Sequence, residues 1–139
     1  MEYGKYGNTY VVRMDKGDEL VSSLLDFAKK ENIKFAAVSG IGATNDVDFG
    51  CFNTEIKQYK GINMKGDFEI TSIVGNINTM NGESYIHLHI NLADENGNVH
   101  GGHLKRANIS VTGEIVITCT NTVIDRRFDP EVGTNLLTF

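Results

Sequence analysis

Beyond residue 45 the chain consists almost entirely of β-prone segments, and this pattern limits its fold more than any other feature. The segments are short, and glycines stand in several of the connections, as is common in hairpin turns. The predicted strands cover residues 46–53, 55–59, 67–78, 84–93 and 107–119, with glycines at positions 61, 66, 82 and 97 between them. Such a succession favours a largely antiparallel sheet, because strands joined by hairpins run in opposite directions.

The first third of the chain differs, because it contains the one clear helical pattern. Apolar residues recur at helical spacing over residues 19–30, and Asp18 is placed as the N-cap. These apolar residues are Leu20, Leu24, Phe27 and Ala28. Residues 6–14 and 33–38 read as strands, and the small residues 39–43 read as a loop. One helix followed by many strands predicts an α+β fold, in which a largely antiparallel or mixed sheet accompanies one main N-terminal helix.

The length of 139 residues predicts one domain, residues 1–139, with a core large enough to be stable alone. The apolar content of 40% and the charged content of 22% are ordinary for a globular protein. No apolar stretch approaches the roughly 20 residues that span a bilayer, and residues 1–5 lack the apolar core of a signal peptide. We therefore expect a cytoplasmic protein that does not contact membranes. Cys51 and Cys119 are expected to be buried thiols rather than a disulfide.

The charge balance argues against non-specific binding to nucleic acid. The formal net charge is −5, whereas such binding depends on basic surface that neutralises phosphates. Basic residues cluster only as the doublets Lys29-Lys30, Lys105-Arg106 and Arg126-Arg127. We expect doublets of this kind to be solvated surface, although a basic patch could still form across subunits.

Two motifs that suggest catalysis or phosphate binding are weak in this chain. Residues 39–43, Ser-Gly-Ile-Gly-Ala, resemble part of a phosphate-binding loop, but no Lys-Ser/Thr follows and the next residues read as a strand. A tight turn or close backbone packing is the favoured interpretation of these glycines. Nucleophilic catalysis lacks support too, because the chain has no Gly-x-Ser-x-Gly elbow and neither cysteine lies near the histidines in sequence.

The histidines offer a stronger signal, because all four fall within residues 87–103. His87 and His89 are spaced i, i+2 in a β-prone segment, which puts both imidazoles on one face of a strand. A turn at residues 95–98 can then fold His103 against them. Three neutral imidazoles without a nearby cysteine match the inner sphere of a zinc site that keeps its fourth position open.

The alternative interpretation is that these histidines are ordinary core or surface residues. A single histidine is usually explained in that way, but three converging rings would bury polar nitrogens without evident partners unless a metal binds them. His100 is expected to lie outside the cluster, in a turn exposed to solvent. Gly101 and Gly102 suggest a bend or bulge that aims His103.

Several motifs taken together resemble the PPC domain family, which plants and prokaryotes share. The central ones are GDFEITSIVG at residues 66–75, HLH at 87–89 and GGHL at 101–104. The family's opening is matched by Arg13 with GDEL at 17–20, its second strand and glycine turn by FAAVSGIGA at 35–43, and its closing segment by RFDP at 127–130 and NLL at 135–137. The resemblance therefore extends over nearly the whole chain.

The resemblance implies an α+β fold and a homotrimer. It also implies metal ligands, because the family is related in fold to acetolactate decarboxylase, which holds zinc through a similar His-x-His and a later histidine. Carried over by position, His87, His89 and His103 would bind zinc or another divalent metal. The family itself implies no enzymatic activity. Its plant members carry AT-hook segments that bind DNA, whereas this chain has no such hook and matches the stand-alone prokaryotic type.

Two functions follow as hypotheses. The first is a trimeric metal-binding protein that acts on, or binds, a small anionic or carbonyl-containing ligand; whether it is an enzyme stays open. Glu69 is the candidate acid/base or ligand-orienting group, with solvent exposure or an ion pair between subunits as the alternative. Arg13 could meet an anion or form an ion pair within the trimer. The second function is a DNA-associated regulatory protein, for which direct DNA binding is not expected at this charge.

Overall fold

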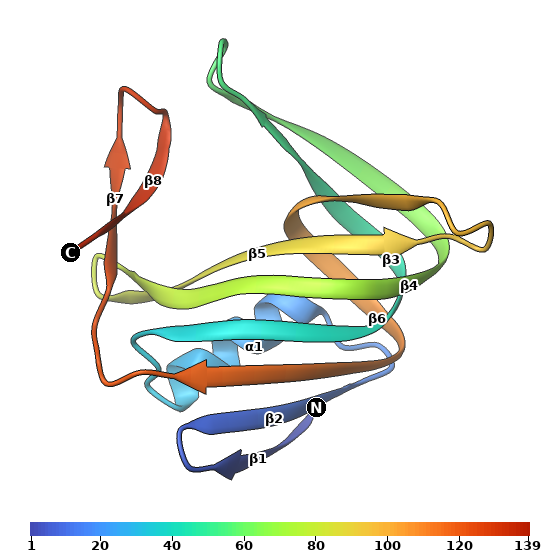
Figure 1. Ribbon diagram of the computed structural model, residues 1–139, viewed down its shortest axis with the longest axis horizontal. Helices are drawn as coiled ribbons and strands as arrows, with labels where there is room; N and C mark the ends of the chain where they lie inside the picture. Colours follow the sequence, from blue (N-terminus) through green and yellow to red (C-terminus); the bar gives the residue numbers. More distant parts are fainter.

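A six-stranded antiparallel sheet forms the body of the protein, as the computed structural model of residues 1–139 describes it (Figure 1). Its strands lie in the order β1-β2-β6-β3-β4-β5, and β7 and β8 form a separate hairpin. The elements are β1 (Glu2–Tyr6), β2 (Thr9–Asp15), α1 (Leu20–Lys30), β3 (Ala36–Asn53), β4 (Gln58–Met80), β5 (Glu83–Ala93), β6 (Val99–Cys119), β7 (Asp125–Asp129) and β8 (Thr134–Thr138). The expected α+β fold with one N-terminal helix is confirmed.

Three long strands give the sheet its shape. β3, β4 and β6 have 18, 23 and 21 residues, so each passes beyond the body. The first residues of β6 pair with β5 and the later ones with β3. Because β4 lies between β3 and β5, this double pairing closes β3, β4, β5 and β6 into a ring. Residues 89–93 of β5 and 99–103 of β6 thereby pair with each other and leave no open edge between these two segments.

Several predicted boundaries differ from the observed ones. Residues 6–14 form not one strand but parts of β1 and β2, because the chain reverses at Gly7, whose φ of 63° is readily adopted by glycine. The predicted loop at 39–43 lies inside β3, with irregular register near Gly40 and Gly42. A Cβ at Gly42 would collide with the carbonyl oxygen of Thr112 on β6. These glycines therefore allow close strand packing, one of the two roles expected of them.

The helix α1 has the predicted span but a different cap. The carboxylate of Glu19, not that of Asp18, accepts from the backbone N–H groups of Val21 and Ser22. Asp18 instead accepts from the N–H of Asp15 in the preceding turn. Leu20, Leu24, Phe27 and Ala28 are buried against the sheet, as their spacing predicted. The structure contains no helix with the length and apolar character needed to cross a membrane.

The helix covers only one of the two faces of the sheet. α1 packs on one face, and we call the opposite one the outer face; in Figure 1 the helix lies behind the sheet. Directly opposed residues of neighbouring strands share a face, so the registers define one row that crosses the outer face from β2 to the start of β6. In order, it contains Val11, Val116, Ser39, Val74, His89 and His103. Its valines are 48%, 40% and 59% exposed.

Two hairpins project beyond the body. The ends of β3 and β4 form an arm, residues 50–62, which rises to the top of Figure 1. The C-terminal hairpin of β7 and β8 stands on the same side. The Nζ of Lys57 at the arm's tip donates to the carbonyl oxygen of Pro130, 3.0 Å away. Both cysteines are free, but they are not buried as expected: Cys51 lies exposed on the arm and Cys119 is half-buried at the end of β6.

Replacing Glu19 by alanine should destabilise the protein by about 1–2 kcal/mol. Besides capping α1, this carboxylate accepts from the N–H of Ala107 on β6 at 3.0 Å, so it joins the helix to the sheet. Urea unfolding followed by circular dichroism measures the change. Asp26→Ala is the matched control, since Asp26 is an exposed acid on the same helix. Equal effects of the two substitutions would contradict the capping role.

Candidate metal centre

Three histidines converge on the outer face where β5 meets the start of β6. His87 and His89 point outward from β5 because the alternate residue Leu88 is buried in the core. His103 on β6 lies directly opposite His89 in the antiparallel register. The i, i+2 spacing and the turn thus bring the three rings together in the way that the sequence predicted.

The distances among these rings suit a single small ion. Ring centroids are 5.2 Å apart for His87 and His89, 5.0 Å for His87 and His103, and 5.8 Å for His89 and His103. One nitrogen of each ring lies within 4.8 Å of the others. A tetrahedral zinc with Zn–N bonds of ~2.0–2.1 Å holds its nitrogens roughly 3.4 Å apart. Rotations that move the rings inward by about 1 Å would therefore complete such a sphere.

Glycines on the neighbouring strands allow this close approach. A Cβ at Gly75 would collide with the carbonyl oxygen of His87, and a Cβ at Gly101 with that of Ile90. The expected bulge at Gly101 and Gly102 is absent from the β5–β6 register, which runs without interruption from Ala93 to His89. The irregularity lies instead between β3 and β6, where Lys105 has no partner. Close packing of the neighbouring strands, rather than a bend in the chain, explains Gly101 and Gly102.

His100 lies outside the cluster. It belongs to β6, not to a turn as expected, and pairs with Leu92 of β5. Its Nε2 is 3.7 Å from a carboxylate oxygen of Asp94, and its side chain is partly exposed. Because His100 and His103 are three residues apart on one strand, their side chains point to opposite faces.

The structure does not bring Glu69 or Arg13 to the histidines. Glu69 is exposed on β4, where it pairs with Ala93 of β5. Ala93 lies four residues beyond His89, which is roughly 13 Å along a strand. Arg13 on β2 is exposed and paired with carboxylates, at 3.1 Å from Glu2 and 2.9 Å from Asp15. Neither Glu69 nor Arg13 therefore belongs to the histidine cluster.

The histidines line a pocket of about 580 Å³ between the body, the arm and the C-terminal hairpin. Tyr59 comes from the arm, and its hydroxyl donates to the carbonyl oxygen of His103 at 3.1 Å. Tyr85 stands on β5 and Arg126 on β7. Lys105 follows the histidines on β6, with its Nζ 4.3 Å from the centre of the Tyr59 ring. Sequence reasoning assigned none of these four residues to the site.

Arg126 connects the C-terminal hairpin to the histidines. Its guanidinium donates to the side-chain oxygens of Asn76 and Asn78, at 3.1 Å each, and to the carbonyl oxygen of Asn135 at 2.8 Å. Its Nη2 is also 3.3 Å from Nδ1 of His87. The side chain is only 7% exposed and lies over the ring of Tyr85. No local pattern in the sequence indicates these contacts, because they join strands far apart in the chain.

The electrostatics of the site favour neutral imidazoles. Burial, aided by the charges of His103, Arg126 and His89, lowers the pKa of His87 from 6.5 to about 4. Burial also lowers the pKa of His103, with smaller contributions from His89, Lys105 and Arg126. A metal binds the neutral ring, so protons compete less at these two positions than at a free histidine.

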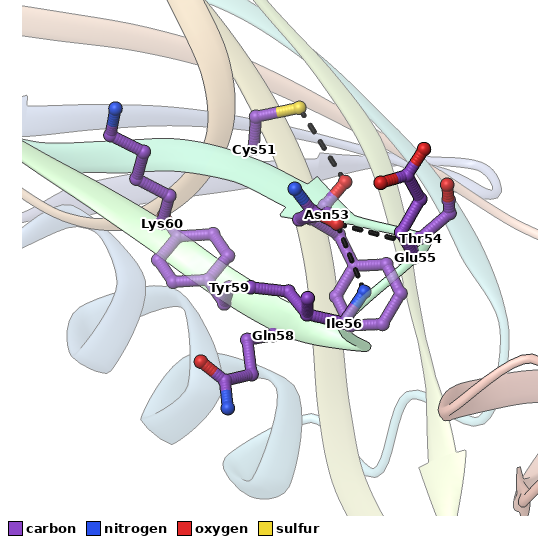
Figure 2. Close-up of a pocket in the computed structure, with 9 residues that line it drawn as sticks. Cys51, Asn53, Thr54, Glu55, Ile56, Gln58, Tyr59 and Lys60 are labelled. Atoms are coloured by element: carbon purple, nitrogen blue, oxygen red, sulfur yellow. Dashed lines mark hydrogen bonds between the residues drawn. The ribbon is translucent and has the colours of Figure 1, made fainter.

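A second and larger hollow, of about 690 Å³, lies along the arm (Figure 2). Its walls come from residues 51–56 and 58–60. The side-chain oxygen of Asn53 closes the arm's turn by accepting from the N–H groups of Glu55 and Ile56. Figure 2 shows Lys60 and Glu55 at opposite ends of this hollow rather than converging. The histidine pocket is the better candidate site, because polar groups from several elements meet there.

Comparison with known families agrees with this geometry. The family model of the Plants and Prokaryotes Conserved domain matches residues 1–121. The chain belongs to this family. The expected membership in the PPC family is thereby confirmed, and the matched region contains all three histidines of the site. Among proteins of curated function, none matches the chain in sequence.

Three similar solved structures each cover almost the whole chain. A candidate DNA-binding protein from Bacteroides thetaiotaomicron is 33% identical, with a TM-score of 0.97 over 99% of this chain and 96% of that one. A plant- and prokaryote-conserved protein from Pyrococcus horikoshii is 33% identical, with a TM-score of 0.87 over 99% and 94%. A metal-containing protein from Archaeoglobus fulgidus is 29% identical, with a TM-score of 0.87 over 99% and 96%.

A more distant likeness concerns the fold alone. α-Acetolactate decarboxylase from Bacillus subtilis is 18% identical, with a TM-score of 0.58 over 88% of this chain and 57% of that one. The chain thus spans little more than half of that enzyme's length. The expected relation in fold is confirmed, and at this identity nothing about the reaction follows for the PPC chain.

The metal-free protein should lose stability as the pH falls from about 6.5 to about 4. The pKa of His87 is 6.5 in an unfolded chain and about 4 in the fold. Within that window the unfolded state binds more protons than the folded state, so acid favours unfolding. Above pH 6.5 the ring is neutral in both states, and the stability that acid removes is fully present. Urea midpoints measured across the window after treatment with a chelator test the effect. His87→Gln should flatten the dependence, and an unchanged slope would contradict the assignment.

Proposed function

We propose that this protein binds one divalent metal ion per chain, zinc in the first instance, through His87, His89 and His103. The observation that carries the proposal is the convergence of three imidazole nitrogens within 4.8 Å on one sheet face. The lowered pKa values of His87 and His103 support it, because they keep both rings neutral. A similar PPC-type structure from Archaeoglobus fulgidus is that of a metal-containing protein.

The proposed site leaves at least one metal position open toward the pocket. A zinc ion with three protein ligands can lower the pKa of a bound water or polarise an oxygen of a ligand. The pocket would then admit a small anionic or carbonyl-containing molecule beside the ion. An acid–base role for Glu69 would require this carboxylate to approach from a second subunit, because within one chain it lies apart from the pocket.

The protein purified without chelators should contain close to one zinc per chain, measured by plasma emission spectroscopy. His89→Ala should abolish most of this binding, because two remaining imidazoles hold zinc weakly. His100→Ala is the matched control, since it removes a neighbouring imidazole outside the cluster. Glu69→Gln should also leave the zinc content unchanged.

Two results would contradict this proposal. One is a zinc content well below one per chain even after incubation with zinc at neutral pH. The other is equal zinc content in His89→Ala and His100→Ala, which would show that the ligands lie elsewhere.

We also propose that the chain assembles as a homotrimer through the outer face. The resemblance to the PPC family suggests the number of subunits, and the exposed valines of the outer row offer an apolar contact surface. Val11, Val74 and Val116 are 48%, 59% and 40% exposed. Val11 and Val116 lie side by side on β2 and β6, and Ser39 of β3 separates them from Val74 on β4. Apolar patches of this kind commonly mark protein–protein contacts.

Light scattering should give a mass about three times the 15.3 kDa of one chain at micromolar concentration. Val74→Lys should reduce this mass, because it places a charge in the proposed contact. Val132→Lys is the control, since Val132 is an exposed valine in the turn between β7 and β8, outside the outer row. A wild-type monomer would refute the proposed assembly.

A DNA-associated role is the second candidate function. It is favoured by the Bacteroides thetaiotaomicron relative, which is named as a candidate DNA-binding protein. The net charge of −5 opposes direct contact with duplex phosphates. Only Lys105 of the Lys105-Arg106 doublet keeps an unpaired charge, because Arg106 lies 2.7 Å from Asp46 and 2.6 Å from Asp48. A regulatory role would therefore act through a partner rather than through the phosphates.

This chain alone should show no retained complex with duplex DNA in a gel-shift assay at ~150 mM salt. The control is the same titration at ~50 mM salt, where a purely electrostatic contact would be stronger. A complex that survives the higher salt and is displaced by A·T-rich but not G·C-rich duplex would place the regulatory role ahead of the metal-binding one.

A further inference from the structure

The charges around the histidine pocket are of one sign. Its fourteen lining residues include Lys105 and Arg126 but no aspartate or glutamate. This is unusual for a chain with 18 acidic and 13 basic residues. Elsewhere three basic side chains, those of Arg13, Lys65 and Arg106, have a carboxylate within 4.0 Å. A divalent ion on the histidines would add to this positive charge.

Arg126 is a buried cation without a carboxylate. All of its hydrogen-bond partners are neutral groups: two asparagine side chains, one backbone carbonyl and His87. Burying a charge without a counter-charge is costly. These neutral partners hold the guanidinium in place at the pocket wall, but they leave its charge uncompensated.

Lys105 on β6 provides the second positive charge of the pocket. It occupies the irregular position of β6, where the register with β3 shifts between Leu104 and Arg106. Such a bulge re-aims a side chain, and here the ammonium lies over the face of Tyr59, 4.3 Å from the ring centre. The residue is exposed and forms no ion pair. Its charge is therefore available to a molecule in the pocket.

Metal binding would free a donor on Arg126. The guanidinium can only donate, so its contact with His87 uses the one acceptor nitrogen of the neutral ring. When either nitrogen of His87 ligates a metal, the other carries the proton and can no longer accept. The N–H on Nη2 of Arg126 then needs a new acceptor. A second N–H, on Nη1, is free already, because this nitrogen donates only to Asn135.

We propose that the pocket binds a compact carboxylate between Arg126 and Lys105, with a second oxygen on the neighbouring carbon directed to the metal. Two N–H groups of one guanidinium match the two oxygens of a carboxylate. The ligand must be compact because Nη2 of Arg126 is only 3.3 Å from a proposed metal ligand, Nδ1 of His87. This inference rests on the proposed metal site and names the class of molecule that the site takes.

Isothermal titration of the zinc-loaded, full-length protein tests the proposal. Glycolate should bind about tenfold more tightly than acetate, because only glycolate carries the second oxygen. Lys105→Met should weaken glycolate binding by about tenfold at unchanged zinc content. Lys16→Met, which removes an exposed lysine outside the pocket, should change nothing. Inorganic phosphate is the comparison anion, and it should bind more weakly than glycolate.

Several outcomes would overturn the inference. They are equal affinity for glycolate and acetate in the zinc-loaded protein, equal effects of Lys105→Met and Lys16→Met, or tighter binding of phosphate than of glycolate. Arg126→Lys gives a second measurement. It keeps the positive charge but removes the two parallel N–H groups of the guanidinium, so it should also lower glycolate affinity. If circular dichroism shows that this variant does not fold, the comparison of Lys105→Met with Lys16→Met decides the test.

Failure of the metal site is a separate result. A wild-type protein without zinc would contradict the proposed function directly. The two cations remain in that protein, so acetate and glycolate should then bind weakly and with equal affinity, and Lys105→Met should still weaken both. Loss of anion binding in the zinc-loaded and zinc-free protein alike would overturn the anion site itself.

Discussion

The pairing of β5 with the first residues of β6 is the interaction on which both the fold and the site depend. It runs from Ala93 and Val99 to His89 and His103, so the same register that closes the sheet into a ring also sets two histidines side by side. Gly101 and Gly102 make it compatible with the strands on either side, because a Cβ at either position would collide with neighbouring backbone. A one-residue slip would turn His103 to the opposite face. Closure and site geometry therefore cannot vary independently.

The site combines strands of the body with two hairpins that carry few core residues. His87, His89 and His103 are fixed from below by Leu88, Ile90 and Leu104, which belong to the buried core. The wall above them is held by polar contacts instead, chiefly those of Arg126 with the asparagines of β4 and the hydroxyl of Tyr59 with His103. Buried apolar contacts therefore set the positions of the three histidines, whereas hydrogen bonds set the shape of the pocket.

Features with a local cause were predictable from the sequence, and those with a distant cause were not. The helix follows from the spacing of Leu20, Leu24 and Phe27, and the histidine pair from its period of two. The choice of Glu19 over Asp18 as the cap depends on Ala107, which comes from β6. Likewise, Ser39-Gly-Ile-Gly-Ala43 continues a strand because β6 lies against it. Arg126 reaches the pocket only because β7 packs beside β4, a contact for which the chain carries no local signal.

The distribution of charge disfavours binding of a long polyanion but allows binding of a small anion. An overall charge of −5 repels a long polyanion, because phosphates along a duplex must meet a broad surface at once. A small anion needs only to reach Lys105 and Arg126, and repulsion from exposed acids is largely screened beyond a Debye length of ~8–10 Å in physiological salt. The lining of the pocket itself offers two cations and no carboxylate. The acidic balance that opposes DNA binding is therefore compatible with capture of a small anion beside the three histidines.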